Sequence, residues 1–219
     1  MARFMRWWYH DRSGRRVFQH YRITDPSDPR DKRYGYRYLV GDNEWNYTKP
    51  ARADGLLYGL PRVLANREAA LYLTEGERDA DALLRPEIAL ASCHHGGAGK
   101  FTKQQAESLA RHRGRIVLVA DNDPAGAYDV CRRYDLLRAV GISAKRLRVR
   151  EVCPSHDGAD LRDHLEAGYG LRDLRPADLD RLRDVAEAST GDPSEGSWAR
   201  ATPEEIAELK NWRPTLVTR

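Results

Sequence analysis

The chain has 219 residues, which is enough for one or two domains, with 37 Lys and Arg against 33 Asp and Glu. A hydrophobic fraction of 41% supports a modest core and excludes a wholly disordered chain. No apolar run approaches the ~20 residues that span a bilayer, and the first residues lack the apolar stretch of a signal peptide. Three widely spaced cysteines exclude a disulfide scaffold and favour a cytoplasmic location, and without a CxxC pair no zinc is expected in this chain.

Residues 1–67 are predicted to form a small antiparallel β-rich subdomain. Residues 4–9 and 15–23 are rich in aromatic and β-branched types and are separated by a Gly-containing turn, which predicts a hairpin. Two further strands are expected at 34–40 and 45–47. This stretch holds about twice as many basic as acidic residues and most of the aromatic residues of the chain.

Basic residues interleaved with aromatic ones suit a phosphate backbone with bases that can stack. The alternative is that the aromatic residues form the core of the β subdomain and the charges form a solvated face. The densest basic cluster, which is the candidate surface for a nucleic-acid template, consists of Arg30, Lys32, Arg33, Arg37, Lys49 and Arg52.

From about residue 68 onward, short apolar runs alternate with amphipathic segments. This rhythm predicts an α/β fold, a parallel sheet with helices on both faces. Strands are expected at 70–74, 88–91, 116–120 and 146–149, and helices at 77–84, 102–112, 124–137 and 161–167. The expected catalytic domain covers 68–170, a helix follows at 171–189, and 190–219 are expected to be a linker and a C-terminal helix or tail.

Acidic residues follow two of the expected strands directly. Glu75 and Gly76 come after the first strand, and Asp121 and Asp123 come after the most apolar one. In open α/β sheets, ligands bind beyond the carboxyl ends of the strands. Two carboxylates ~5 Å apart repel by about 3 kcal/mol at an effective dielectric of 20, so such a group needs a divalent cation or bound protons. Oxygen ligands suit Mg²⁺ or Mn²⁺, and this is the setting of phosphoryl transfer.

These residues carry a family resemblance. The stretches LTEGERDADALL, SCHHGGAGKFT and VLVADNDPAGAYDV, followed by GADLRDHL, resemble the TOPRIM fold, and are most similar to the bacterial-type primases of phages and plasmids. The resemblance covers roughly residues 60–167 and, more loosely, the basic β region before them. It implies a TOPRIM-like parallel-sheet core flanked by helices, preceded by a basic subdomain that holds the template.

The resemblance also implies roles for single residues. Glu75 matches the family's invariant acid, Asp121 and Asp123 match its metal-binding pair, and Asp160 matches the first acid of a late motif. Many primases have a second acid two positions later, where this chain has Arg162, so the number of metal ions stays open. Two further acids, Asp79 and Asp163, could either belong to the site or lie at solvated positions on a helix.

The glycine-rich segment Gly96–Lys100 precedes an expected helix. It is not a Walker A loop, because His94 and Phe101 stand where that loop needs Gly and Ser or Thr. Consecutive glycines before a helix can still present backbone N–H groups to an anion. By the resemblance, Lys100 would contact a nucleotide phosphate or the template, and the alternative is a flexible connection.

The leading functional prediction is a DNA primase-type nucleotidyltransferase that uses nucleoside triphosphates and Mg²⁺ to synthesise short RNA primers on single-stranded DNA. A TOPRIM metal-dependent nuclease could use the same acids, and a non-catalytic adaptor of the replication machinery that binds single-stranded DNA is the third alternative. Because the chain has no zinc ribbon or helicase of its own, a helicase or a zinc-binding initiation module could be supplied by another chain. No membrane partner is expected.

Overall fold

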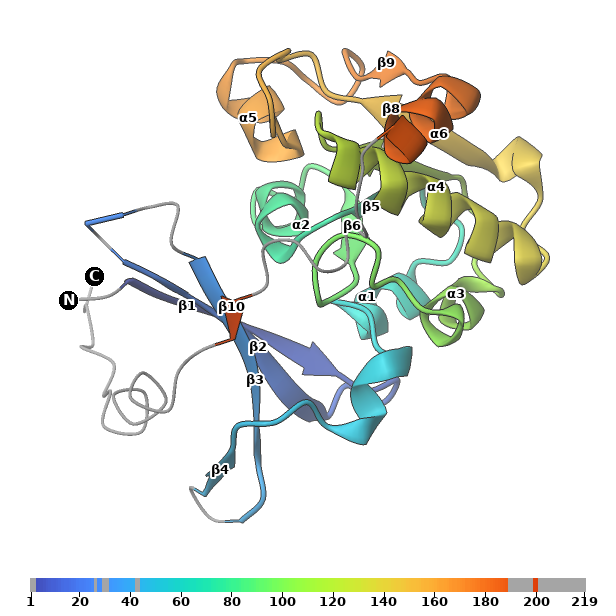
Figure 1. Cartoon of the computed structure of the whole chain (residues 1–219). Helices are drawn as coiled ribbons and strands as arrows, with labels where there is room; N and C mark the ends of the chain where they lie inside the picture. The colour runs from blue at the N-terminus through green and yellow to red at the C-terminus, as the bar shows by residue number, and fades with distance from the viewer. Residues whose placement is uncertain (1–2, 26, 29–31, 42–43, 189–198, 201–219) are drawn as a thin grey trace. The chain divides into compact units, whose positions relative to one another are not determined.

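The computed structural model describes residues 3–25, 27–28, 32–41, 44–188 and 199–200. The chain divides into two compact units, both drawn in Figure 1. The first unit comprises residues 1–8, 18–51 and 197–219, and the second comprises residues 9–17 and 52–196. This grouping differs from the sequence-based division at residue 67, because residues 52–67 belong to the second unit.

The N-terminal sheet has five strands, and their order is β1-β2-β3-β10 with β4 paired to β3. The β2–β3 and β3–β4 pairs are antiparallel, as the sequence predicts, whereas the two residues of β10 pair with β3 in parallel. This last strand lies within the segment expected to be a linker and a tail, and the helix expected after it lies outside the described residues. The strands are β1 Arg3–His10, β2 Arg16–Thr24, β3 Lys32–Leu39, β4 Trp45–Asn46 and β10 Ala199–Arg200.

Aromatic side chains of the first unit form its interior. Tyr21 is 1% exposed and its ring lies 5.5 Å from that of Phe4, and Phe18 is fully buried beside Tyr36. These rings therefore belong to the core of the β unit, which is the alternative that the sequence left open. They do not form an exposed stacking surface. Burial of large aromatic area gives a small sheet most of its stability.

The second unit is the α/β part. Its parallel strands and helices alternate as predicted, each element lying within a few residues of its expected bounds. They are β5 Leu71–Thr74, α2 Glu77–Leu84, β6 Leu90–Cys93, α3 Lys103–Leu109, β7 Ile116–Ala120, α4 Pro124–Ala139, β8 Leu147–Glu151 and α5 Leu161–Glu166. The 3₁₀ turn η1 Ala51–Gly55 and the helix α1 Leu60–Ala65 come before them, and η2 Ala144–Arg146 leads into β8.

The sheet of the second unit has the strand order β6-β5-β7-β8-β9, with all pairs parallel except β8–β9. The chain leaves β5 toward β6 and leaves β7 toward β8, so right-handed crossovers place α2 and α4 on opposite faces. One face is covered by α2 and α5, whose Leu83 and Leu161 share a buried cluster with Val117 and Val119. On the other face α4 packs along β7, with α3 and α6 beside it.

The helix predicted over 171–189 begins later than expected. Residues Arg175–Pro176 form the short strand β9 against β8, and the helix α6 runs only over Leu179–Ala188. Pro176 explains the difference, because proline has no amide hydrogen for an interior turn of a helix and disfavours helical backbone at the residue before it. The Asp178 carboxylate accepts the backbone N–H of Asp180 and so marks the start of the helix.

Among the described residues, no helix is both long enough and apolar enough to cross a bilayer.

Candidate acidic site at the carboxyl edge of the sheet

The acids predicted from the sequence meet where the strand order reverses. Because β5 and β7 are adjacent and parallel, the residues that follow them emerge side by side at the carboxyl edge of the sheet. Glu75 directly follows β5, and Asp121 directly follows β7. This is the crevice in which open α/β sheets bind ligands. Gly76 between β5 and α2 has φ −126°, which other residues also adopt, so the turn does not require glycine.

A third loop is held against the two strand ends by backbone hydrogen bonds. Asn122 N–H donates to Ala159 O at 2.8 Å, and Gly158 N–H donates to Asn122 O at 3.1 Å. These bonds bring the start of α5, with Asp160, beside Asp121 and its neighbours. The structure thus brings the late acidic motif to the same edge as the first two motifs.

Two of the acids also cap helices. An oxygen of Asp123 accepts the Gly126 N–H at 2.7 Å at the start of α4, and an oxygen of Asp160 accepts the Asp163 N–H at 2.8 Å at the start of α5. A helix N-terminus favours a negative charge, so both carboxylates are held by the fold itself. The capping bond uses one oxygen of each, which leaves the other as a prospective ligand atom.

Burial and mutual repulsion raise the pKa of the clustered acids. For Glu75 the pKa rises from 4.5 to about 8, first because of burial and then because of the charges of Asp129 and Asp123. For Asp121 burial raises the pKa well above its ordinary value, with Glu75 adding to the effect. Burial also raises the pKa of Asp160. The site therefore holds more negative charge than its surroundings compensate, which is the electrostatic condition for binding a cation or retaining protons.

Asp79, which the sequence left open, belongs to this group. It lies on α2 one turn after Glu75 and is only 6% exposed. Its Oδ1 accepts the Arg162 N–H at 3.2 Å, and burial followed by the charge of Asp160 raises its pKa from 3.8 to about 8. The spacing of four residues between Glu75 and Asp79 was the available sequence signal.

One buried ion pair beneath the site was not predicted. Arg133 and Asp129 on α4 are fully buried, and Arg133 Nε lies 2.7 Å from Asp129 Oδ2. The same guanidinium donates to Leu73 O at 2.6 Å and to Val119 O at 3.0 Å, two residues before Glu75 and Asp121 respectively. Arg133 thus joins α4 to the ends of both strands that carry the principal acids. Its positive charge also lowers the pKa of Glu75 and Asp121, against the stronger effect of burial.

The donor chemistry of this edge fits a hard divalent cation, because its prospective ligands are carboxylate oxygens with raised pKa values. Within the part of the chain that the structure describes, however, no three carboxylate, histidine or cysteine side chains are arranged as a ready-made ligand group. The assignment of Glu75, Asp121, Asp123 and Asp160 as metal ligands therefore stays a prediction. Asp163, the other residue left open, binds back to the first turn of α5, since it accepts the Asp160 N–H at 3.3 Å.

The glycine-rich segment has a structural role that limits its use as an anion site. Gly96, Gly97 and Gly99 all adopt positive φ, which explains the glycines. The Gly99 N–H donates to Asp129 Oδ1 at 2.8 Å, so this amide is already occupied. Lys100 is exposed next to it and keeps its predicted role as a phosphate contact.

The basic cluster predicted in the N-terminal region divides into different environments. Lys32 and Lys49 are exposed in the first unit, Arg33 is half-buried, and Arg52 is exposed in the second unit. Arg37 is only 5% exposed: it lies 4.2 Å from the ring centre of Trp45 and donates to Gln19 Oε1 at 2.7 Å. The burial of Arg37 indicates a structural role in the β unit rather than a place on an exposed basic face. Arg30, the remaining member, lies outside the described residues.

We expect Gly126→Ala to destabilise the second unit by about 1–3 kcal/mol, the usual cost of overpacking a tight site. A Cβ at this position would lie 2.6 Å from the backbone oxygen of Asp121, so the first turn of α4 would have to move away from that acid. Urea unfolding measures the effect. Gly170→Ala is the control, because its Cβ would meet its nearest atom, Asp173 Oδ2, at an ordinary 3.5 Å. Equal stability of the two variants would contradict the close approach.

The raised pKa values predict that Mg²⁺ binds more tightly as the pH rises. Near pH 6 Glu75 and Asp79 retain protons that the ion must displace, whereas above about 8 both are ionised. Affinity measured by calorimetry should rise by up to roughly tenfold per pH unit for each displaced proton. Without metal, the folded chain binds protons more tightly than the unfolded chain, so stability should fall from about pH 4.5 to 8. Metal affinity that is independent of pH would contradict this arrangement.

Comparison with known proteins identifies chains that are similar to this one in fold. Residues 72–163 match the Toprim-like family. Among solved structures, the catalytic core of the Escherichia coli primase is 21% identical with a TM-score of 0.55, over 94% of this chain and 60% of that one. A DnaG catalytic core is also 21% identical, with a TM-score of 0.56, over 95% and 62% of the two chains.

The primase fragment of the bacteriophage T7 primase-helicase protein is 18% identical, with a TM-score of 0.50, over 83% of this chain and 60% of that one. This chain thus spans about 60% of the length of the primase cores that it resembles. A search of curated proteins gave no match in sequence. Residues 72–163 are therefore similar to the Toprim-like family, and the chain is similar in fold to the catalytic cores of primases.

Proposed function

We propose that this protein is a primase-type nucleotidyltransferase that synthesises short RNA primers on single-stranded DNA with Mg²⁺ or Mn²⁺. The observation that carries the proposal is the group of half-buried acids at the carboxyl ends of β5 and β7, where desolvation and mutual repulsion raise the pKa of Glu75 and Asp121. The similarity in fold to primase cores covers nearly the whole chain and so includes the basic N-terminal strands.

In this proposal Asp121 and Asp123, with Glu75 and Asp160, hold the metal. The bound ion would bind the phosphates of the incoming nucleotide and neutralise the charge that develops on them. Asp123 and Asp160 are positioned for this by their capping bonds, and Arg133 fixes the strand ends from beneath. Alternatively, Glu75 would not hold the metal but would accept the proton of the primer 3′-hydroxyl once it is ionised, for which a pKa of about 8 is near the working pH.

The template and the nucleotide would be held by positive charge outside the acidic group. Lys32, Arg33 and Lys49 of the first unit, with Arg52 of the second, are the candidates for the DNA backbone, and Lys100 is the candidate for the nucleotide phosphates. The T7 relative is part of a primase-helicase protein. A helicase or a zinc-binding initiation module on another chain is correspondingly a proposed partner for this one.

The test is to incubate the full chain with single-stranded DNA, labelled nucleoside triphosphates and Mg²⁺. Labelled products that lengthen with time support the proposal. Shortened DNA in a reaction without nucleotides would instead indicate a nuclease that uses the same acids. DNA binding with neither product, under both Mg²⁺ and Mn²⁺, would contradict catalysis and indicate an adaptor.

A further inference from the structure

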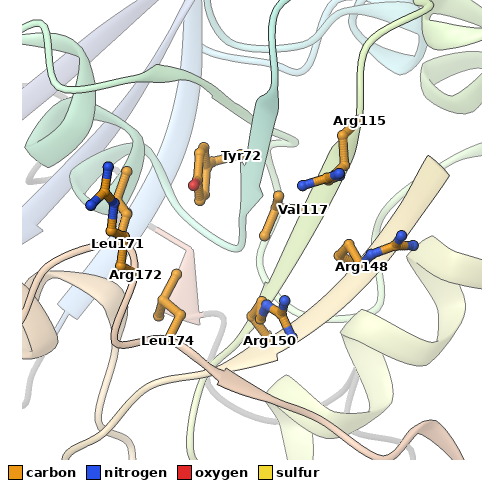
Figure 2. Close-up of a pocket in the computed structure, with 8 residues that line it drawn as sticks. All are labelled: Tyr72, Arg115, Val117, Arg148, Arg150, Leu171, Arg172 and Leu174. Carbon is orange, nitrogen blue, oxygen red and sulfur yellow. The ribbon is translucent and has the colours of Figure 1, made fainter.

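A pocket of about 210 Å³ lies on the sheet face of the second unit that α2 and α5 cover only in part (Figure 2). Strand pairing places Tyr72, Val117 and Arg148 in one row across β5, β7 and β8. Side chains alternate along a strand, so Arg115 and Arg150, each two residues from this row, point to the same face. The segment after α5 closes the pocket with Arg172 and Leu174.

Four of the lining residues are arginines, and the pocket lining contains no acid. Within the described part of the chain, none of the four forms an ion pair with a carboxylate, and only Arg148 has side-chain hydrogen bonds, to the backbone oxygens of Lys145 and Leu147. Other arginines of the unit are neutralised, as in the pairs of Arg133 with Asp129 and Arg183 with Asp135. Four like charges around one hollow repel one another, so a bound anion would stabilise the arrangement.

The lining also indicates which anion. Guanidinium groups match phosphate oxygens through paired N–H donors. The Tyr72 ring and the Leu174 side chain add an aromatic and an apolar surface, on which a sugar or base can pack. The volume is below the roughly 300–1,000 Å³ of pockets that enclose a whole small molecule. One backbone phosphate with part of its nucleotide fits this space better than a complete nucleoside triphosphate does.

We infer that this pocket binds a phosphate group of single-stranded nucleic acid, at a place separate from the acidic edge. Tyr72 lies three residues before Glu75, and Arg115 six residues before Asp121, on strands that rise ~3.3 Å per residue. Arg150 is level with Val119, two residues before Asp121, so the lining extends from about 7 to 20 Å along the strands from the carboxyl edge. Binding there needs neither the acids nor a metal, so the inference goes beyond the proposed reaction and does not depend on it.

The test measures binding of a fluorescently labelled oligodeoxythymidine to the full chain in EDTA, over a range of salt concentrations. Arg115→Gln/Arg172→Gln removes two exposed charges of the pocket. Because one phosphate contact on a single strand contributes about 0.7 of salt slope, this variant, which loses that contact, should bind roughly 5-fold more weakly near 0.1 M salt, with a slope smaller by about 0.7. The control Arg62→Gln/Arg111→Gln removes the same charge from exposed positions elsewhere in the second unit and should change both quantities far less.

Equal weakening by the two variant pairs would show general attraction only and would overturn the inference, as would unchanged binding by the pocket variant. Unlabelled nucleoside triphosphate, also in EDTA, is the second probe. The nucleotide should compete only weakly with the labelled oligonucleotide, and to the same extent in the wild type and the pocket variant. If it competes strongly with the wild type but not with the pocket variant, the pocket binds free nucleotide instead. Loss of primer synthesis with this binding pattern intact would count against the proposed function and leave the pocket assignment standing.

Discussion

Asp121→Asn is expected to lower nucleotide incorporation by at least about a thousandfold while making the metal-free protein more stable. Electrostatic stabilisation of developing charge is commonly the largest contribution to catalysis, and removing a group that places it costs rates of this order. The same carboxylate is half-buried beside Glu75, Asp79 and Asp160, and its desolvation and their charges raise its pKa. Replacing it by a neutral amide removes that repulsion, so the melting temperature without metal should rise at pH 8.

Incorporation of labelled nucleotide and thermal unfolding, measured on the same preparation, check both parts. The control is Asp184→Asn, which changes the same charge at an exposed position on α6. If Asp121→Asn lost activity only because it was poorly folded, its melting temperature would fall rather than rise. Full activity of the variant would remove the acid from the proposed machinery.

The largest loss of stability is expected from Arg133→Met. It leaves the buried carboxylate of Asp129 without its arginine, with the Gly99 N–H and His94 Nε2 beside it, and removes the donors to Leu73 O and Val119 O. Breaking a buried ion pair on one side typically costs 3–5 kcal/mol, because the remaining charge is uncompensated. Urea unfolding of the whole chain gives this value directly.

The double variant Asp129→Asn/Arg133→Met separates the two contributions. With both charges gone, it should recover a large part of the lost stability, although the backbone oxygens of Leu73 and Val119 still lack their donors. A double variant as unstable as the single one would show that the strand-end hydrogen bonds, rather than the unpaired charge, dominate. Arg183→Met is the matched control, since its pair with Asp135 is partly exposed and should be worth under about 1 kcal/mol.

Much of the fold could be predicted from the sequence because the second unit has strong local signals. The apolar run at 116–120 and the acids that follow it indicate a buried parallel strand whose end carries chemistry, and the structure has β7 there. The predicted start of the helix at residue 171 was wrong, because Pro176 lies inside the segment and cannot occupy an interior helical turn. The grouping of Asp121 with Glu75 follows from strand adjacency, which the order of elements in an α/β fold makes foreseeable.

Other parts of the site depend on packing that no local pattern reports. The i,i+4 spacing of Asp129 and Arg133 is typical of an exposed helical pair, yet both are fully buried. Arg37 counted as one of a basic cluster, and only the tertiary structure shows it between aromatic rings. Two of the four pocket arginines lie on β8, one directly precedes β7 and one follows α5, so their convergence is a property of strand register rather than of sequence neighbourhood.

The hairpin tip between β1 and β2 belongs to the second unit. Tyr9 at the base of this tip is fully buried in that unit. Its hydroxyl donates to Glu77 Oε1 at 2.8 Å, and its ring lies edge-on to that of His95. The α/β unit is therefore not a contiguous stretch of polypeptide, and no single cut of the gene would isolate it. An expression fragment starting at residue 52 or 68 would lack the Tyr9 ring and the hydroxyl that contacts Glu77 and Cys93. Biochemical dissection of this protein is better served by point substitutions than by truncation.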